Sequence, residues 1–197
     1  TYSLPVTFTE NNYDKILASN SHFRMLCNES ERLKEIGESS IHIVQKFIEL
    51  KGLSLREVET LSRYLEIYQI LSQNKISNKF IPGYCCYRTL AVILYSFGRE
   101  LALNYVEDKI DAQLIINFFG VNRLPYQTDQ YNNNIYYYAL FGITYKYMPE
   151  GSPLLPSEND EKNRWAEISD YHILKGNAGV EDPVRIFKNT LKVFLLQ

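Results

Sequence analysis

The chain has 197 residues, of which 45% are hydrophobic and 22% charged, and its formal net charge is −2. This length and composition predict one globular domain, or one domain with a small annex. The charge gives no sign of a nucleic-acid or anionic-membrane partner. The longest apolar run, residues 90–95, is far below the roughly 20 residues that span a bilayer. We therefore expect a cytoplasmic protein with no membrane span in this chain.

The amino-terminal residues show neither a signal peptide nor an initiator methionine, which favours a processed chain or a piece of a longer protein. The three cysteines are Cys27 and the adjacent Cys85 and Cys86. Their odd number and spacing predict reduced, buried thiols. Zinc sites usually combine histidines and cysteines at short spacing in the sequence. The three histidines here are far apart in the sequence and no CxxC pair occurs, so we expect no metal site.

Helical periodicity dominates the first half of the chain. Residues 10–26 and 30–50 carry apolar side chains at helical spacing. We expect the first helix to be interrupted at Ser19–Ser21 and the second to be loosened near Gly37. A glycine at position 52, after a lysine, is a typical helix end.

The next helix should begin at Ser54, because Glu57 stands three residues later and completes a capping box. Apolar residues then recur at helical spacing and predict a buried face. A second face carries charges of alternating sign, with Arg56 in the first turn and Arg63 two turns later. A surface ion pair between Arg56 and Glu59 is the simplest expectation for that arginine.

A long helix is predicted over about 86–106, and a shorter one over about 111–119, capped by Asp111 and ended by Gly120. The last third begins with a loop and a tyrosine-rich helix at about 135–148. A loop at 149–163 separates it from two final helices, at about 163–174 and 182–196.

Strand signals are scarce, so the sequence predicts an all-α bundle of roughly seven helices. We divide it into a helical bundle at 1–120 and a tyrosine-rich helical extension at 121–197, which can also form one domain with the first segment.

No segment carries the chemistry of a known catalytic motif. The phosphate-binding GxxxxGK[ST] loop and the GxSxG nucleophile elbow are both missing from the sequence. We therefore assign no catalytic residue, no metal ligand and no cofactor to this chain.

Seven of the sixteen tyrosines lie between residues 126 and 147. A stacking surface for single-stranded nucleic acid would need basic residues among them, but Lys146 is the only one between Leu124 and Glu161. We expect these tyrosines to pack between helices or to face a protein partner. The candidates for a contact surface are Tyr136, Tyr137, Tyr138 and Tyr145.

Arg164 and His172 resemble the R-x4-6-H signature of the HEPN ribonucleases, which are all-α proteins. The seven intervening residues exceed that spacing by one, and Trp165 occupies a position that is polar in the signature. A surface arginine and a partly buried histidine are the alternative.

The order of segments over about residues 40–120 resembles the KAP family of P-loop NTPases. The matching features are the helix start at Leu53 to Glu57, within LSLREVE, and the apolar helix with its ending at Ile93 to Tyr105. The resemblance implies that this chain is the carboxy-terminal helical lid of a larger ATPase. Its Walker A and Walker B segments, with ATP and Mg²⁺, would belong to an upstream domain.

In that family, an arginine at the start of a lid helix is the usual device for sensing the γ-phosphate. Arg56 matches this position, and Arg63 is the second candidate. Two alternatives stay open: a free-standing helical protein–protein interaction module without catalysis, and a HEPN-like ribonuclease.

Overall fold

The computed structural model describes residues 10–125, 131–149, 152–154 and 182–195, and this part is all-α, as predicted. Eight α-helices and two 3₁₀ helices lie in these ranges, without a β-strand. They are α1 (Glu10–Glu29), η1 (Leu33–Glu35), α2 (Glu38–Lys51), α3 (Leu55–Ser72), α4 (Pro82–Phe97), α5 (Arg99–Val106), α6 (Ala112–Phe118), α7 (Tyr131–Thr144), η2 (Tyr145–Tyr147) and α9 (Pro183–Leu195). The predicted helix at 163–174 lies outside the described residues.

The expected interruption of the first helix is wrong, since α1 continues through Ser19–Ser21. Ser19 is buried, and its hydroxyl donates to the Leu53 carbonyl at 2.7 Å. This contact with the α2–α3 turn gives the polar side chain a partner inside the protein. The break near Gly37 is a full one: Gly37 is extended, and α2 begins at the next residue.

The capping box of α3 is confirmed. Ser54 Oγ accepts from the Glu57 amide, and the Glu57 carboxylate accepts from the Ser54 amide at 2.8 Å. These bonds satisfy two of the four amides that a helix start leaves unpaired. The pKa of Glu57 is lowered, first by the hydrogen bond from the Ser54 side chain and then by that from its backbone.

The predicted single helix at 86–106 is wrong in two respects. Its first part, α4, begins at Pro82, where proline occupies the first turn. The helix then breaks at Gly98, which separates α4 from α5. A Cβ at Gly98 would lie 2.8 Å from the Phe118 ring of α6, so the close approach of these helices requires glycine there. Asp111 caps α6 as predicted, by accepting from the Gln113 amide at 2.8 Å.

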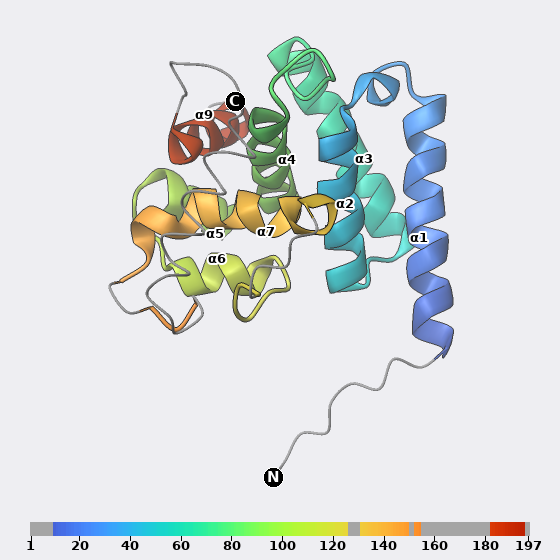
Figure 1. The fold of residues 1–197 in the computed structure, drawn as a ribbon. Helices are drawn as coiled ribbons and strands as arrows, with labels where there is room; N and C mark the ends of the chain where they lie inside the picture. The colour runs from blue at the N-terminus through green and yellow to red at the C-terminus, as the bar shows by residue number, and fades with distance from the viewer. Residues whose placement is uncertain (1–9, 126–130, 150–151, 155–181, 196–197) are drawn as a thin grey trace.

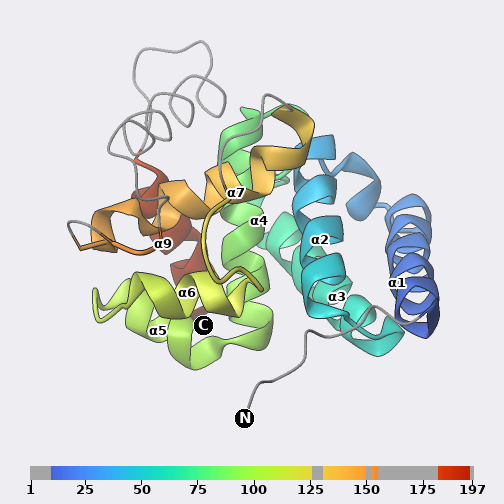
Figure 2. The same ribbon diagram turned by 60° about the horizontal axis from the view of Figure 1, so that its bottom comes forward.

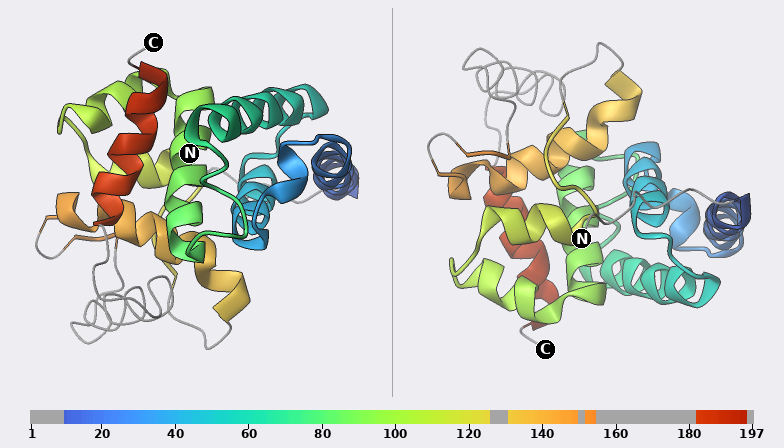
Figure 3. Two further views of the ribbon diagram at one scale, coloured as in Figure 1. Left: turned by 90° about the horizontal axis from the view of Figure 1, so that it is seen from above. Right: turned by 90° about the horizontal axis from the view of Figure 1, so that it is seen from below.

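Helix α4 lies at the centre of the molecule, as Figure 1 shows, with α2 and α3 on one side and α9 on the other. Helix α1 forms the outer edge beyond α2 and α3, and α7 crosses α4 (Figure 2). Figure 3 shows α9 lying along α4 and α5. Because α7 and α9 contribute to the same hydrophobic core as α2–α4, the sequence segments 1–120 and 121–197 share one core.

Candidate functional site

Arg56 lies in the first turn of α3, and its side chain is exposed. Its backbone carbonyl accepts from Thr60 Oγ1 at 2.9 Å. The expected ion pair with Glu59 is wrong, because that carboxylate lies 3.3 Å from His22 Nε2 on α1 instead. Within the described residues the Arg56 guanidinium forms no ion pair and no hydrogen bond.

The start of α1 lies beside the turn that leads into α3. Lys15 Nζ donates to the Gly52 carbonyl at 3.0 Å, one turn before Ser19 reaches Leu53. Lys51, at the end of α2, lies 5.9 Å from the centre of the Phe118 ring. The exposed Arg56 therefore follows directly on the turn that Lys15 contacts, and the Glu57 carboxylate next to it in sequence caps the start of α3.

Arg63 lies in a different setting, a cleft of about 460 Å³ between α1 and α3. Three glutamates line the same cleft: Glu29, Glu59 and Glu66. Glu66 accepts from the Ser30 hydroxyl at 2.5 Å, and no described residue forms an ion pair with Arg63. Because the carboxylates outnumber the one guanidinium, the field in this cleft opposes binding of a phosphate.

The four candidate tyrosines divide into buried and accessible residues. Tyr136 and Tyr138 are 1% and 3% exposed, so they are not a contact surface in this structure. Tyr136 donates to the Phe119 carbonyl at 2.8 Å, and burial raises its pKa well above the ordinary value. Tyr137 is half-buried, whereas Tyr145 is 41% exposed. Tyr136 and Tyr138 instead pack between helices, which was the other expectation for these residues.

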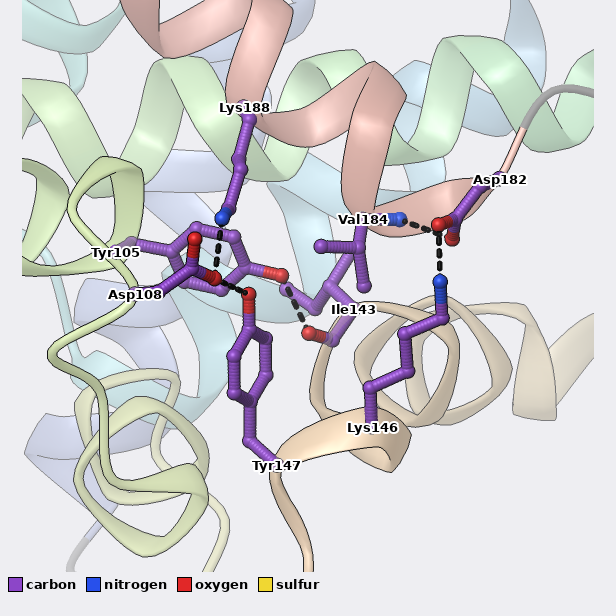
Figure 4. Close-up of polar contacts among 8 residues, drawn as sticks. All are labelled: Tyr105, Asp108, Ile143, Lys146, Tyr147, Asp182, Val184 and Lys188. Atoms are coloured by element: carbon purple, nitrogen blue, oxygen red, sulfur yellow. Dashed lines mark hydrogen bonds and ion pairs between the residues drawn. The ribbon is translucent and has the colours of Figure 1, made fainter.

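A polar cluster that the sequence did not indicate joins α5, η2 and α9 (Figure 4). Asp108, after the end of α5, accepts from Tyr147 at 2.8 Å and from Lys188 of α9. Its backbone is left-handed, with φ at 58°, a conformation that aspartate tolerates better than most residues. The Lys188 hydrogen bond, followed by the Tyr147 one, lowers the pKa of Asp108.

The same cluster fixes the start of α9. Asp182 accepts from the Val184 amide at 3.1 Å and pairs with Lys146 of η2 (Figure 4). Next to it, the buried Tyr105 donates to the Ile143 carbonyl at 2.5 Å. The spacing of Arg185, Lys188 and Lys192 places them on one helix face, but it does not show which residues lie opposite that face.

The cysteines are free and buried, as predicted. Burial raises the pKa of Cys27 and Cys85 to about 11, and the pKa of Cys86 further.

Within the described ranges, no group of three or more histidine, cysteine, aspartate or glutamate residues is arranged to hold a metal ion. Arg164 and His172, the ribonuclease candidates, lie outside the described residues.

The described part of the chain thus defines an all-α protein with an exposed arginine in the first turn of α3 and a cluster of charged side chains along α9. None of its described helices combines the length and apolar character that crossing a membrane requires. Comparison of the chain with protein-family models, with curated proteins and with solved structures finds no match.

Proposed function

We propose that this chain is the carboxy-terminal helical lid of a larger KAP-like P-loop ATPase, where it senses the nucleotide state and contacts a partner. The observation that supports this proposal most is that the Arg56 side chain is exposed and has no ion-pair partner among the described residues. A guanidinium held at the start of a helix suits phosphate oxygens, because its planar fork matches them and the helix dipole adds positive potential.

The position of α1 is consistent with this arrangement. Its first turns contact the Gly52–Leu53 turn, so a domain joined before residue 10 would approach the end of the molecule that carries Arg56. ATP and Mg²⁺ would be held by that upstream domain, because this sequence has no Walker A loop. Arg63 is the weaker of the two arginine candidates, since three glutamates share its cleft.

The experiment requires the full gene product. We expect a Walker A motif to be encoded upstream of residue 1 and the full-length protein to hydrolyse ATP. Arg56→Ala should lower kcat by about 100-fold, the typical cost of removing one donor to transition-state charge. Arg56→Lys should restore part of the rate, whereas the matched control, Arg32→Ala, at an exposed arginine without an ion pair among the described residues, should leave it within about twofold.

Two results would contradict the proposal. One is a reading frame that starts at this point with no upstream nucleotide-binding segment. The other is an ATPase whose Arg56→Ala variant has the wild-type rate while its melting temperature shows that it is folded.

A second candidate function, a helical interaction module without catalysis, is supported by the exposed apolar side chains of α3. Ile67, Ile70 and Leu71 are 42%, 57% and 41% exposed and follow one face of the helix. Such a patch favours a protein partner. Replacing all three residues with glutamine should abolish partner binding under this alternative and leave ATP hydrolysis unaffected under the first.

A further inference from the structure

A hollow of about 500 Å³ lies between the end of α5, η2 and the exposed face of α9. Six charged side chains line it: Asp108, Lys146, Asp182, Arg185, Lys188 and Lys192. Four of them are cations and two are anions. The hollow is therefore locally positive, although the whole chain has a net charge of −2.

Both carboxylates of the hollow are already neutralised. Asp108 pairs with Lys188 and also accepts from Tyr147, while Asp182 pairs with Lys146 and also accepts from the Val184 amide. Figure 4 shows both carboxylates with their partners: Asp108 with Lys188 and Tyr147, and Asp182 with Lys146 and Val184. Lys192 lies within electrostatic reach of Asp108, but neither carboxylate forms an ion pair with Arg185 or Lys192.

Arg185 and Lys192 are the two cations that stay without an ion pair among the described residues. They are seven positions apart on α9, which places them on the same face at a rise of about 10 Å. Both side chains are exposed. The opposite face of α9, with Phe187, Leu191 and Phe194, is buried in the core and fixes the rotation of the helix.

The neutral polar side chain between these two cations, Asn189, can donate hydrogen bonds through its amide NH₂ group. Asn189 lines the hollow one turn after Arg185, and its side-chain amide is accessible. An anion between Arg185 and Lys192 could accept hydrogen bonds from the guanidinium fork, the amide and the ammonium group together. The arginine fork favours a phosphate over a spherical anion, because it offers parallel N–H donors.

We propose that this hollow binds a phosphate group of an organic ligand, with Arg185 and Lys192 as its charged contacts and Asn189 as a neutral donor. The ion pairs of Asp108 and Asp182 position α9 and keep the two acidic side chains from opposing the ligand. The site is separate from Arg56 and does not depend on the ATPase proposal. Its ligand is either a free organic phosphate or a phosphorylated lipid headgroup, since both present the same chemistry.

The test measures binding of two probes to the purified full chain. Calorimetry with sodium pyrophosphate probes a soluble phosphate, and sedimentation with phosphatidylcholine vesicles containing phosphatidylinositol 4-phosphate probes a headgroup. The variant is the double substitution Arg185→Gln and Lys192→Gln. Its matched control is Lys34→Gln with Lys79→Gln, which removes the same charge from exposed lysines that form no ion pair among the described residues.

We expect the wild-type chain to bind one of the two probes and the α9 double variant to bind it at least about tenfold more weakly, since each charge-assisted hydrogen bond contributes strongly. The control should bind within about twofold of wild type. Pyrophosphate binding identifies a soluble ligand, and binding to vesicles alone identifies a headgroup. Failure to bind either probe, or an equal loss in the control variant, would overturn the proposal.

Asn189→Ala supplies a second measurement that leaves the net charge unchanged. It should weaken binding by several-fold through the lost donor, whereas a purely electrostatic attraction would not respond to it. Circular dichroism checks that α9 stays folded in each variant. A folded Asn189→Ala variant with wild-type affinity, together with an unaffected α9 double variant, would likewise refute the site.

Discussion

The hydroxyl of Tyr68 on α3 lies 3.3 Å from the hydroxyl of Thr190 on α9, although 122 positions separate the two residues. Both side chains are buried. Burial raises the pKa of Tyr68, and the hydrogen bond to Thr190 only partly offsets this. The contact ties the last described helix to the helix that carries Arg56.

Replacing Tyr68 with phenylalanine tests how much this contact stabilises the fold. Thr190 keeps its bond to the Ile186 carbonyl at 2.9 Å, so no partner is left fully unsatisfied. We expect a loss of about 1 kcal/mol in the free energy of unfolding, measured by urea denaturation. Tyr145→Phe, at an exposed position with no hydroxyl contact in the described structure, is the control and should change stability by less than about 0.5 kcal/mol.

Comparing alanine substitutions at Gly120 and Gly52 separates the cost of backbone strain from the cost of a steric clash. Both have positive φ, at 78° and 61°. A Cβ at Gly120 would lie 2.9 Å from the Leu50 Cβ, but a Cβ at Gly52 meets no atom within 4 Å.

Gly52→Ala should therefore cost only the left-handed conformation, about 1 kcal/mol. Gly120→Ala should cost about 1–3 kcal/mol more, because the α2–α6 contact must also open. Equal losses in thermal or chemical denaturation would show that the Leu50 contact relaxes freely.

The ion pair between Lys188 and Asp108 predicts a stability difference that depends on pH. The pKa of Asp108 is lowered in the folded protein, chiefly by Lys188. Its contribution is therefore complete above the ordinary pKa of the unfolded chain, near 3.9, and is lost as pH falls through the lower folded value.

Asp108→Asn keeps the left-handed preference and the acceptor oxygen but removes the charge. We expect a lower melting temperature than wild type at pH 7 and a difference that shrinks as the pH falls below the ordinary aspartate pKa, near 3.9. Asp14→Asn, at an exposed position on α1 without an ion pair in the described structure, should show no such dependence. A pH-independent difference for Asp108→Asn would mean that the charge is not what stabilises this cluster.

Features that depend on neighbouring residues could be predicted from the sequence. The capping box at Ser54 and the cap at Asp111 are local hydrogen bonds between residues two or three positions apart. The break at Gly98 was missed, because the local sequence does not show that the Phe118 ring, twenty positions later, occupies the space beside residue 98. The continuous α1 was missed for the same reason, since Ser19 finds its partner at Leu53.

The candidate sites follow the same division. The position of Arg56 in the first turn of α3 could be predicted, but the contact of Glu59 with His22, 37 positions away, could not. The Asp108 cluster brings together residues as far as 80 positions apart. Helical periodicity shows which face of α9 is charged, but not which element lies opposite that face.

The helix that carries Arg56 begins at a cap whose removal has a defined consequence. Ser54 Oγ accepts from the Glu57 amide and donates to the Glu57 carboxylate at 2.7 Å. Ser54→Ala loses both bonds and should reduce the free energy of unfolding by about 1 kcal/mol, whereas Ser54→Thr keeps a hydroxyl and should stay within about 0.5 kcal/mol of wild type. Denaturation in urea measures both.

Hydrogen exchange of the first-turn amides of α3 should be faster in the alanine variant, because the turn that fixes Arg56 frays. If the lid proposal holds, Ser54→Ala should also lower the ATPase rate of the full-length protein, by less than Arg56→Ala does. An alanine variant with unchanged stability and exchange would mean that the leucine face of α3 alone determines where the helix begins.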